Sequence, residues 1–544
     1  MNDQKKTSQQ PTKLLMDIGH SDWQCGTQVE PISDDRQPLN IVADVRIDSV
    51  SNQSIAAAPV IESLSLRMDN SIIEVRGSTS AKMGNVEAFS MGTWKGIAEV
   101  KSDGTFSNPN VPADYLLTGD SIKVRVTNSD TTSYPVVATD YFVHPRSIWI
   151  LPTKTKAADQ TYYQWWIQWA DYQPTGYMLP AGETASIWLD GNDEEVWALV
   201  GIQGIAKKSD RTSQTENMRE TRLKIGENIL PIDPLGGVIH IRNNGNSGCR
   251  VILDSKIRPI PYYVLMQTPP LDFRRMLEKS DRLSEVQLVG DRVVISAYAD
   301  TYEIFAHADV GEIVRSHEEV LRIEAQAAGL DGSTELHTRS NMWIHAVEST
   351  SSFYPHASTG YIGLPHSKDV NSEYMNALLG GLAHKLWVTL HEYGHHFQNR
   401  ANSNTVFAEN SVNIYALAVG RVHENNYADE FPKRWPPLRA WLSKPAAEKN
   451  YMESPDTQAI FEQLRKGFGE NYLPRWDRYV RENPSPNNDL INFTASLSRV
   501  ANANLAVFFA EWGVIKTNDQ TWNALHALNL PSPPEGLTNQ IPYT

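Results

Sequence analysis

Every second residue is apolar in two segments near the N-terminal end of the chain. The apolar positions are Leu64, Leu66 and Met68 in the first segment and Ile122, Val124 and Val126 in the second. Turn-forming sequences such as SDGTFS (102–107) separate segments of this kind. Apolar residues with a period of two, interrupted by turns, are typical of short strands. We therefore expect a β-sandwich at residues 55–145, with an irregular β-rich extension of the following domain as the alternative.

The next part of the chain, residues 146–265, also has the pattern of strands. Two strand-like runs flank a Pro-Ala-Gly turn in GYMLPAGETASIWLDG (176–191). A further strand-like run follows at residues 238–241. These runs predict a second β-rich domain ahead of the remaining chain.

From residue 266 onward, apolar residues recur at helical spacing. The clearest examples are DFRRMLEKSDRL (272–283) and ADVGEIVRSHEEVLRIEAQAAG (308–329). Residues 266–544 are therefore predicted to form a mainly α-helical domain. Residues 1–54, in contrast, are largely polar and lack periodicity, which is typical of a flexible leader.

The composition narrows the classes of function. The 544 residues include 49 Lys and Arg and 64 Asp and Glu, which gives a formal net charge of −15. An acidic chain is a poor candidate for binding nucleic acids or anionic membranes. No apolar run approaches the ~20 residues of a membrane span, and we find no secretory signal peptide. Cys25 and Cys249 are the only cysteines, and we expect two free thiols.

The densest group of chemically active side chains lies in TLHEYGHHFQNR (389–400). The longer stretch 382–400 has no proline, so the sequence predicts one helix. His391 and His395 are four positions apart and share a helix face, which suits two imidazoles on one zinc ion. Glu392 lies at the edge of that face, where it can act as a general base on a water without binding the metal. This HExxH arrangement is a strong signal.

Three other residues in or near the motif have different predicted roles. His396 falls off the shared face and is expected at the surface or in a supporting position near the ligands. His384 lies two turns before His391 and is expected to be structural or to line a cleft. Gly394 is expected to allow close approach of a neighbouring element, since a glycine inside a helix costs stability. The alternative for the whole cluster is a helix in a protein core whose histidines are hydrogen-bonded and bind no metal.

A catalytic zinc usually has three protein ligands and one open position. The stretch TVFAENSVNIYALAVG (405–420) has a helical pattern, and its Glu409 follows His395 by 14 positions. Two antiparallel helices joined by a short loop would bring Glu409 to the same metal. Asn413, four residues after Glu409, would orient a ligand through a hydrogen bond.

Other interpretations of Glu409 remain open. Its carboxylate would also suit the positive end of a helix dipole. Glu424 and Asp429 are competing ligands, although both would need longer loops.

The sequence HEYGHHFQ followed by ENSVNIY resembles the HExGHxxQ…ExxxNxY pattern of the enhancin-like metallopeptidases. These are gluzincins, and the family includes viral enhancins and bacterial mucin-degrading proteases. Segments similar to that family also occur at TGYMLPAGE, IGENIL and GGVIHIRN in the β-rich region, at TGYIGLP before the zinc helix, and at RKGFGENYLPRWDRYVRE and FFAEWGV near the C-terminus. The resemblance covers residues 146–515. Residues 55–145 resemble bacterial immunoglobulin-like modules more weakly.

The resemblance implies a secreted zinc metalloendopeptidase with a gluzincin catalytic domain. It implies that one catalytic Zn²⁺ is held by His391, His395 and Glu409, with Glu392 as the base, and these are the residues that the spacing also indicates. It further implies mucins and other O-glycosylated proteins as substrates. Such substrates place the enzyme outside the cell or at its surface.

Two further roles are predicted around this centre. Gluzincins usually add a Tyr or His that stabilises the oxyanion, and the candidates are Tyr415, His366 and Tyr361. Tyr415 has an alternative role in packing against the zinc helix. The segment TGYIGLP (359–365) is expected to form an edge strand that pairs with an extended substrate. The residues expected on that edge are Gly360, Tyr361, Ile362 and Gly363.

Two other classes of function are consistent with the sequence. One is a peptidase without a glycan requirement, such as an aminopeptidase. The other is a glycoprotein-binding adhesin that uses the protease fold. The intact HExxH motif argues against the adhesin, because a degenerate protease would be expected to lose Glu392 or a ligand first.

Overall fold

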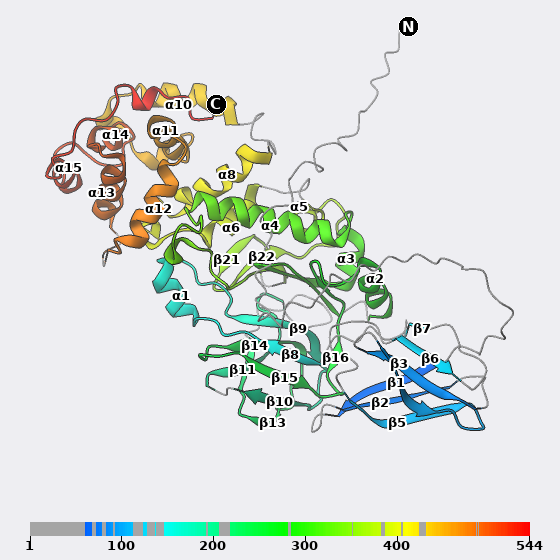
Figure 1. Ribbon diagram of the computed structural model, residues 1–544. Helices are drawn as coiled ribbons and strands as arrows, with labels where there is room; N and C mark the ends of the chain where they lie inside the picture. The colour runs from blue at the N-terminus through cyan, green and yellow to red at the C-terminus, as the bar shows by residue number, and fades with distance from the viewer. Residues whose placement is uncertain are drawn as a thin grey trace, which may run out of the picture. The chain divides into compact units, whose positions relative to one another are not determined.

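The computed structural model describes residues 60–67, 72–78, 83–90, 93–112, 123–127, 136–137, 146–191, 194–205, 218–280, 284–350, 352–381, 387–403, 406–423, 431–485, 487 and 489–543. The predicted leader, residues 1–54, lies outside these ranges, and so do Cys25 and His384. Among the described residues, the N-terminal part is rich in strands and the C-terminal part is helical, which confirms the predicted order of a β-rich part and a helical part (Figure 1).

Most of the described residues in the interval 55–145, which is predicted to be a sandwich, lie in strands. They form two antiparallel sheets with the strand orders β1-β2-β5 and β4-β3-β6-β7. Their bounds are β1 Val60–Arg67, β2 Ile72–Ser78, β3 Asn85–Ser90, β4 Thr93–Glu99, β5 Thr105–Pro112, β6 Lys123–Thr127 and β7 Val136–Val137. An immunoglobulin-like arrangement of these strands stays a prediction.

The second β-rich part contains two antiparallel sheets. Their strand orders are β13-β10-β15-β8 and β12-β11-β14-β9-β16. The bounds are β8 Ser147–Ile150, β9 Tyr172–Leu179, β10 Ser186–Gly191, β11 Val196–Val200, β12 Arg219–Arg222, β13 Gly226–Ile229, β14 Gly237–Asn243, β15 Cys249–Leu253 and β16 Arg258–Pro259. A helix, α1 (Lys156–Tyr163), follows β8.

The two sheets share one apolar core. Ile187 and Val251 from one sheet and Val196 and Ile239 from the other are fully buried in a single cluster. Because side chains alternate between the faces of a strand, each strand sends every second residue into this core. Cys249 lies in the same cluster as a free thiol, and burial raises its pKa to about 11.

A six-stranded mixed sheet follows, and most of its strands lie within the part that is predicted to be mainly helical. The strand order is β17-β18-β19-β20-β22-β21. The bounds are β17 Tyr262–Val264, β18 Glu285–Val289, β19 Val293–Tyr298, β20 Ile344–Ser349, β21 His356–Ser358 and β22 Tyr361–Pro365. Every position of β18, β19 and β20 is buried, so these strands lack the alternation that would mark them in the sequence.

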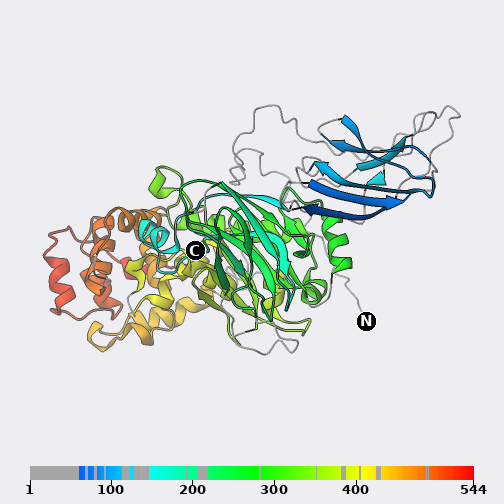
Figure 2. The same ribbon diagram turned by 90° about the horizontal axis from the view of Figure 1, so that it is seen from below.

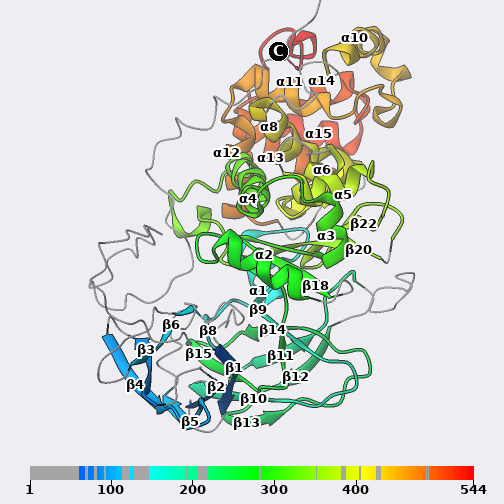
Figure 3. The same ribbon diagram turned by 90° about the vertical axis from the view of Figure 1, so that its right-hand side faces the viewer.

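Helices pack against this sheet and continue to the C-terminus. Helices α4 and α6 lie between the sheet and the C-terminal helices (Figures 1 and 3). In the view from below, the orange and red C-terminal helices lie to one side of the green strands (Figure 2). None of the described helices combines the length and apolar character needed to cross a bilayer. The bounds are α2 Pro270–Lys279, α3 Ala299–Phe305, α4 Val310–Ala327, α5 Glu373–Leu379, α6 Trp387–His395, α7 Ala408–Ser411, α8 Asn413–His423, α10 Trp435–Leu442, α11 Ala459–Phe468, α12 Tyr472–Glu482, α13 Leu490–Ala501, α14 Ala506–Glu511 and α15 Gln520–His526.

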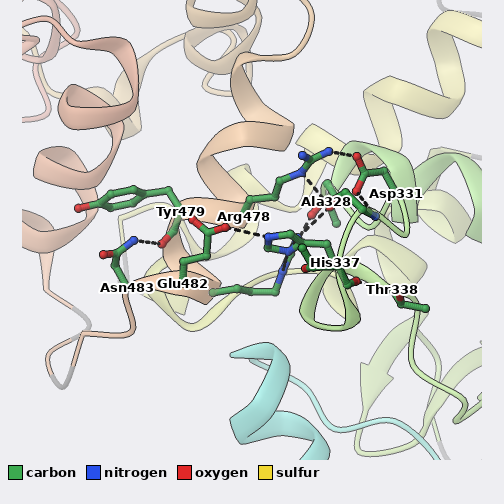
Figure 4. Close-up of polar contacts among 12 residues, drawn as sticks. Ala328, Asp331, His337, Thr338, Arg478, Tyr479, Glu482 and Asn483 are labelled. Carbon is green, nitrogen blue, oxygen red and sulfur yellow. Dashed lines mark hydrogen bonds and ion pairs between the residues drawn. The ribbon is translucent and has the colours of Figure 1, made fainter.

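Polar contacts fix α12 to the segment that follows α4. Arg481 donates to the backbone carbonyl of Ala328 at 2.8 Å. His337 contacts the Glu482 carboxylate through Nε2 at 2.9 Å (Figure 4). These contacts hold in place the helix that presents the buried Asp477 to the candidate site.

Candidate metal centre

Helix α6 positions the HExxH motif through its apolar face. Leu390 and Tyr393 are buried in the main core. The Tyr393 hydroxyl also hydrogen-bonds Nδ1 of His317 on α4 at 2.5 Å. With 3.6 residues per turn, this anchoring leaves His391 and His395 together on a different face of the helix.

The helix ends at His395, earlier than the predicted helix over residues 382–400. The reason is tertiary pairing, because residues 398–400 are hydrogen-bonded to the segment before β9. The backbone of Trp166 donates to the carbonyl of Gln398 at 2.8 Å, and that of Arg400 donates to the carbonyl of Gln164 at 2.7 Å. These bonds replace the next helical turn.

Glu409 lies on the short helix α7, immediately before α8. A side chain at Gly394 would not fit between α6 and this segment, since a Cβ there would lie 2.9 Å from both Cγ2 and the carbonyl oxygen of Val412. The predicted role of Gly394 in close approach is confirmed. The close packing brings Glu409 to the two histidines of α6.

Three possible metal-binding atoms converge at this point. Oε2 of Glu409 lies 3.3 Å from Nε2 of His391 and 3.5 Å from Nε2 of His395. One ligand atom from each residue lies within 4.8 Å of the other two. The spacing in the sequence therefore predicted residues that the fold does bring together.

Two neutral amides hold the outer nitrogens of the imidazole rings. Nδ1 of His391 donates to Oδ1 of Asn413 at 3.0 Å, as the sequence predicted for an orienting role of Asn413. Nδ1 of His395 donates to Oε1 of Gln398 at 2.6 Å. Each amide thereby fixes the orientation of its ring, with Nε2 directed toward Glu409. The role of Gln398 was not predicted, although the final Q of the family pattern marks its position.

Gln398 also joins the two ligand-bearing segments. Its Nε2 donates to the carbonyl of Ala408 at 2.7 Å and to Oγ of Ser411 at 2.9 Å. These two residues flank Glu409 on α7. The fully buried Gln398 thus fixes His395 and the backbone around Glu409 at the same time.

Charge interactions within the group favour ionised Glu409. Hydrogen bonds from His391 and His395 lower the pKa of Glu409 well below its usual range. Burial lowers the pKa of His391, but the bonds to Glu409 and Asn413 outweigh burial and raise it overall. The lowered pKa of Glu409 keeps its carboxylate anionic, which is the form that binds a cation.

Glu392 has a different environment from Glu409. It is buried, and the desolvation of its carboxylate raises its pKa, against the opposing influence of His391 and His395. The imidazole of His356 acts on it in the same sense as these two histidines, and His356 begins strand β21, which packs against α6. A buried carboxylate with a raised pKa is suited to carry a proton.

His396 corrects the expectation of a surface position. It is fully buried, and its Nε2 contacts the carbonyl of Tyr361 at 3.3 Å. Its own carbonyl accepts from Nε1 of Trp169 at 2.9 Å. Burial lowers the pKa of His396 to about 3, so it is a neutral structural residue.

The segment before β9 supplies an aromatic wall to the group. The Trp166 ring meets the His395 ring edge to face, with 5.8 Å between centroids. Trp166 is only partly buried. It therefore lies at the boundary between the candidate ligands and solvent.

Tyr415 was a candidate for stabilising the oxyanion, but its hydroxyl group is bonded to another side chain. It is fully buried, and its hydroxyl donates to Asp477 at 3.1 Å. Burial raises the pKa of Asp477 to about 7, with Arg481 opposing the shift. The structure thus supports the alternative role of Tyr415, packing beneath the zinc helix.

The other two oxyanion candidates lie on β22 and directly after it. His366 is partly buried, and its Nδ1 hydrogen-bonds the buried Glu348. The hydroxyl of Tyr361 contacts Nε2 of His356 at 3.3 Å, and the two rings pack edge to face. His356, which the sequence analysis did not single out, thus links Tyr361 to the surroundings of Glu392.

The segment predicted to be an edge strand for substrate binding is not at the edge of the sheet. β22, which contains Tyr361, Ile362 and Gly363, pairs with β20 on one side and β21 on the other. Gly360 precedes it in a turn. Within the described sheet, the edge strand on this side is β21 (His356–Ser358).

The residues at this centre fit a zinc ion. Zinc in catalytic sites usually takes three ligands of the imidazole and carboxylate type and keeps one position open. The two Nε2 atoms and the Glu409 carboxylate form such a set, and the outer nitrogens are already engaged. The Glu409 side chain is 71% exposed, so the open position would face solvent.

Comparisons with known families agree with this arrangement. Residues 257–513 match the family described as peptidase M60, enhancin and enhancin-like. Residues 152–251 match the N-terminal domain of M60-like peptidases. No curated protein matches the chain.

Several solved structures have a similar fold. A functionally unknown conserved protein from Bacillus anthracis str. Ames is 24% identical, with a TM-score of 0.62 over 72% of this chain and 80% of that one. The ZmpB metallopeptidase from Clostridium perfringens is 16% identical, with a TM-score of 0.57 over 72% and 83%. The M60 catalytic domain of Clostridium perfringens ZmpC, in complex with the sialyl T antigen, is 16% identical, with a TM-score of 0.56 over 72% and 81%.

The two family matches follow each other along the chain and cover both the β-rich part and the part with the metal centre. The structural likenesses show the same fold over most of this region. The chain therefore belongs to the peptidase M60 family, enhancin and enhancin-like.

Proposed function

We propose that this protein is a zinc metalloendopeptidase that cleaves peptide bonds in mucin-type O-glycosylated proteins. One observation carries the proposal, namely the convergence of His391, His395 and Glu409 beside the buried carboxylate of Glu392. Membership of a peptidase family supports hydrolysis as the reaction. A structural histidine cluster would not need an adjacent buried carboxylate.

The chain's own residues would divide the chemistry between them. Zinc bound by the three ligands would supply a Lewis acid that polarises the scissile carbonyl and acidifies a water molecule. Glu392 would accept a proton from the attacking water and deliver it to the leaving amine. The raised pKa of Glu392 suits both steps, because the carboxylate must take up and release a proton near neutral pH. His366 and Tyr361 remain the candidates for oxyanion stabilisation.

The glycoprotein substrate is supported by the ligands of related structures. The M60 domain of ZmpC is in complex with the sialyl T antigen. Another metallopeptidase, with a TM-score of 0.59, is in complex with the Tn antigen. Such antigens belong to O-glycoproteins, so we also propose that this enzyme acts outside the cell or at its surface.

Digestion of a mucin-type O-glycoprotein by the purified protein, before and after enzymatic removal of the glycans, tests the proposal together with metal analysis. We expect one equivalent of zinc and cleavage of the glycosylated form alone. Cleavage of both forms would keep the peptidase chemistry and refute the glycan requirement. Absence of both zinc and cleavage would refute the enzyme and favour a glycoprotein-binding adhesin.

The corrected sheet edge gives a separate prediction. Ile362→Pro is expected to destabilise the fold by about 3 kcal/mol or more, because β22 is paired on both sides. A lower Tm in a thermal melt would show this effect.

If the substrate pairs with β21 instead, N-methylation of one backbone amide of the substrate beside the cleaved bond is expected to raise KM with little change in kcat. An unchanged KM across a full N-methylated series would contradict pairing with β21.

A further inference from the structure

Two adjacent aromatic side chains extend from the segment that enters the edge strand. Phe353 is 93% exposed and Tyr354 is 77% exposed. Single exposed apolar residues are normal on protein surfaces and need no explanation. Two consecutive rings that both face water at the start of an open strand are a feature that a binding role would explain.

The exposure is imposed by an ordered turn. The backbone of Tyr354 donates to Oγ of Ser352 at 3.1 Å, and that hydroxyl donates to the Tyr354 carbonyl at 2.9 Å. Nδ1 of His356 donates to the same carbonyl at 3.1 Å. The backbone that carries the two rings is thereby fixed before any ligand binds, which lowers the entropy cost of binding.

The turn is directly connected to the candidate site. His356, which receives the end of the turn, is the first residue of β21, and β21 packs against helix α6, which carries His391, Glu392 and His395. Phe353 lies three positions before His356, so their Cα atoms are at most ~10 Å apart. A substrate chain lying along β21 would therefore reach both rings within a few residues of the cleaved bond.

The exposure of these two rings favours a sugar over an apolar side chain as the ligand. An apolar side chain gains most from a concave pocket that removes it from water on several sides. The rings of Phe353 and Tyr354 are instead exposed to water, next to the polar side chain of Ser352, which bonds to the Tyr354 backbone. The negative face of an aromatic ring attracts the positively polarised C–H groups of a pyranose, and the sugar hydroxyls stay in water.

We propose that Phe353 and Tyr354 form an aromatic platform that binds an O-linked sugar on the substrate chain, next to the residues that are cleaved. The platform rests on the proposed function, because it needs a glycosylated chain in the candidate site. It would add specificity without touching the reacting atoms. The glycan at the platform need not be the one next to the cleaved bond.

Binding measurements on the zinc-loaded protein test the platform directly. The parent is the Glu392→Gln variant, which would bind substrate without cleaving it, and the probe is a mucin-type O-glycopeptide titrated by calorimetry. Adding Phe353→Ala and Tyr354→Ala is expected to raise Kd for the glycopeptide about 10-fold or more, with Kd for the same peptide without sugars unchanged. The matched control is Ile229→Ala with Ile232→Ala, two exposed apolar residues of the β-rich part, 72% and 68% exposed.

Each outcome decides the matter. An unchanged Kd for the glycopeptide refutes the platform, and so does an equal loss for both forms of the peptide. If wild type does not cleave the glycopeptide and the parent does not bind it, the proposed function fails and the platform falls with it. Because both rings are exposed, the double variant is expected to keep the Tm of its parent.

Discussion

Replacement of Glu392 with glutamine is expected to lower kcat/KM by about 10²–10⁴-fold while zinc content stays at one equivalent. Glutamine has nearly the same shape as glutamate but cannot take a proton from water. The carboxylate is buried beside His391 and His395, so no solvent group is placed to replace it. Steady-state kinetics on a cleavable glycopeptide and metal analysis of the same preparation check the prediction.

Glu453→Gln provides a control for this experiment, because Glu453 is an exposed glutamate in a surface turn. It is expected to leave kcat/KM unchanged. Full activity of Glu392→Gln would show that another group acts as the base. Loss of zinc from that variant would instead make Glu392 a ligand and contradict its proposed role.

Replacement of His395 with alanine is expected to abolish both zinc binding and cleavage. The change removes one of three ligands and also leaves Oε1 of Gln398 without its donor. Gln398→Met, which keeps the ligands but frees Nδ1 of His395, is expected to weaken zinc binding by about 10–100-fold. Competition with a zinc-binding dye measures the affinity of the apo-protein without any assay of activity.

The graded response separates the ligand from the residue that orients it. Millimolar zinc is expected to restore cleavage to Gln398→Met but not to His395→Ala. Equal affinity of wild type and Gln398→Met would show that the amide does not orient the imidazole. One equivalent of zinc in His395→Ala would refute the proposed ligand set.

The metal group could be predicted from the sequence because its geometry is local. The period of the α-helix alone places His391 and His395 on one face, and a short connection brings back Glu409 and Asn413. The end of the helix could not be predicted in this way. It depends on pairing with Trp166, which is far away in the sequence.

Strand partners were the main source of error for the same reason. The run that contains Ile362 has the composition of a strand, but its sequence does not indicate how many neighbours it has. Tyr415 shows the same limit, because its partner Asp477 lies 62 residues away on α12. The buried strands β18 and β19 were missed because full burial removes the alternation that identifies a strand.

The candidate ligands are near neighbours along the chain, but their support is distant. The bond between His391 and Asn413 spans 22 residues, whereas the bond from Trp169 to the His396 carbonyl spans 227. A synthetic peptide with the α6–α8 sequence would contain every ligand and both orienting amides, but it would lack the distant contacts that hold this segment in place. High-affinity zinc uptake by this chain would therefore report that its long-range folding is complete, a step that contacts of large sequence separation make slow.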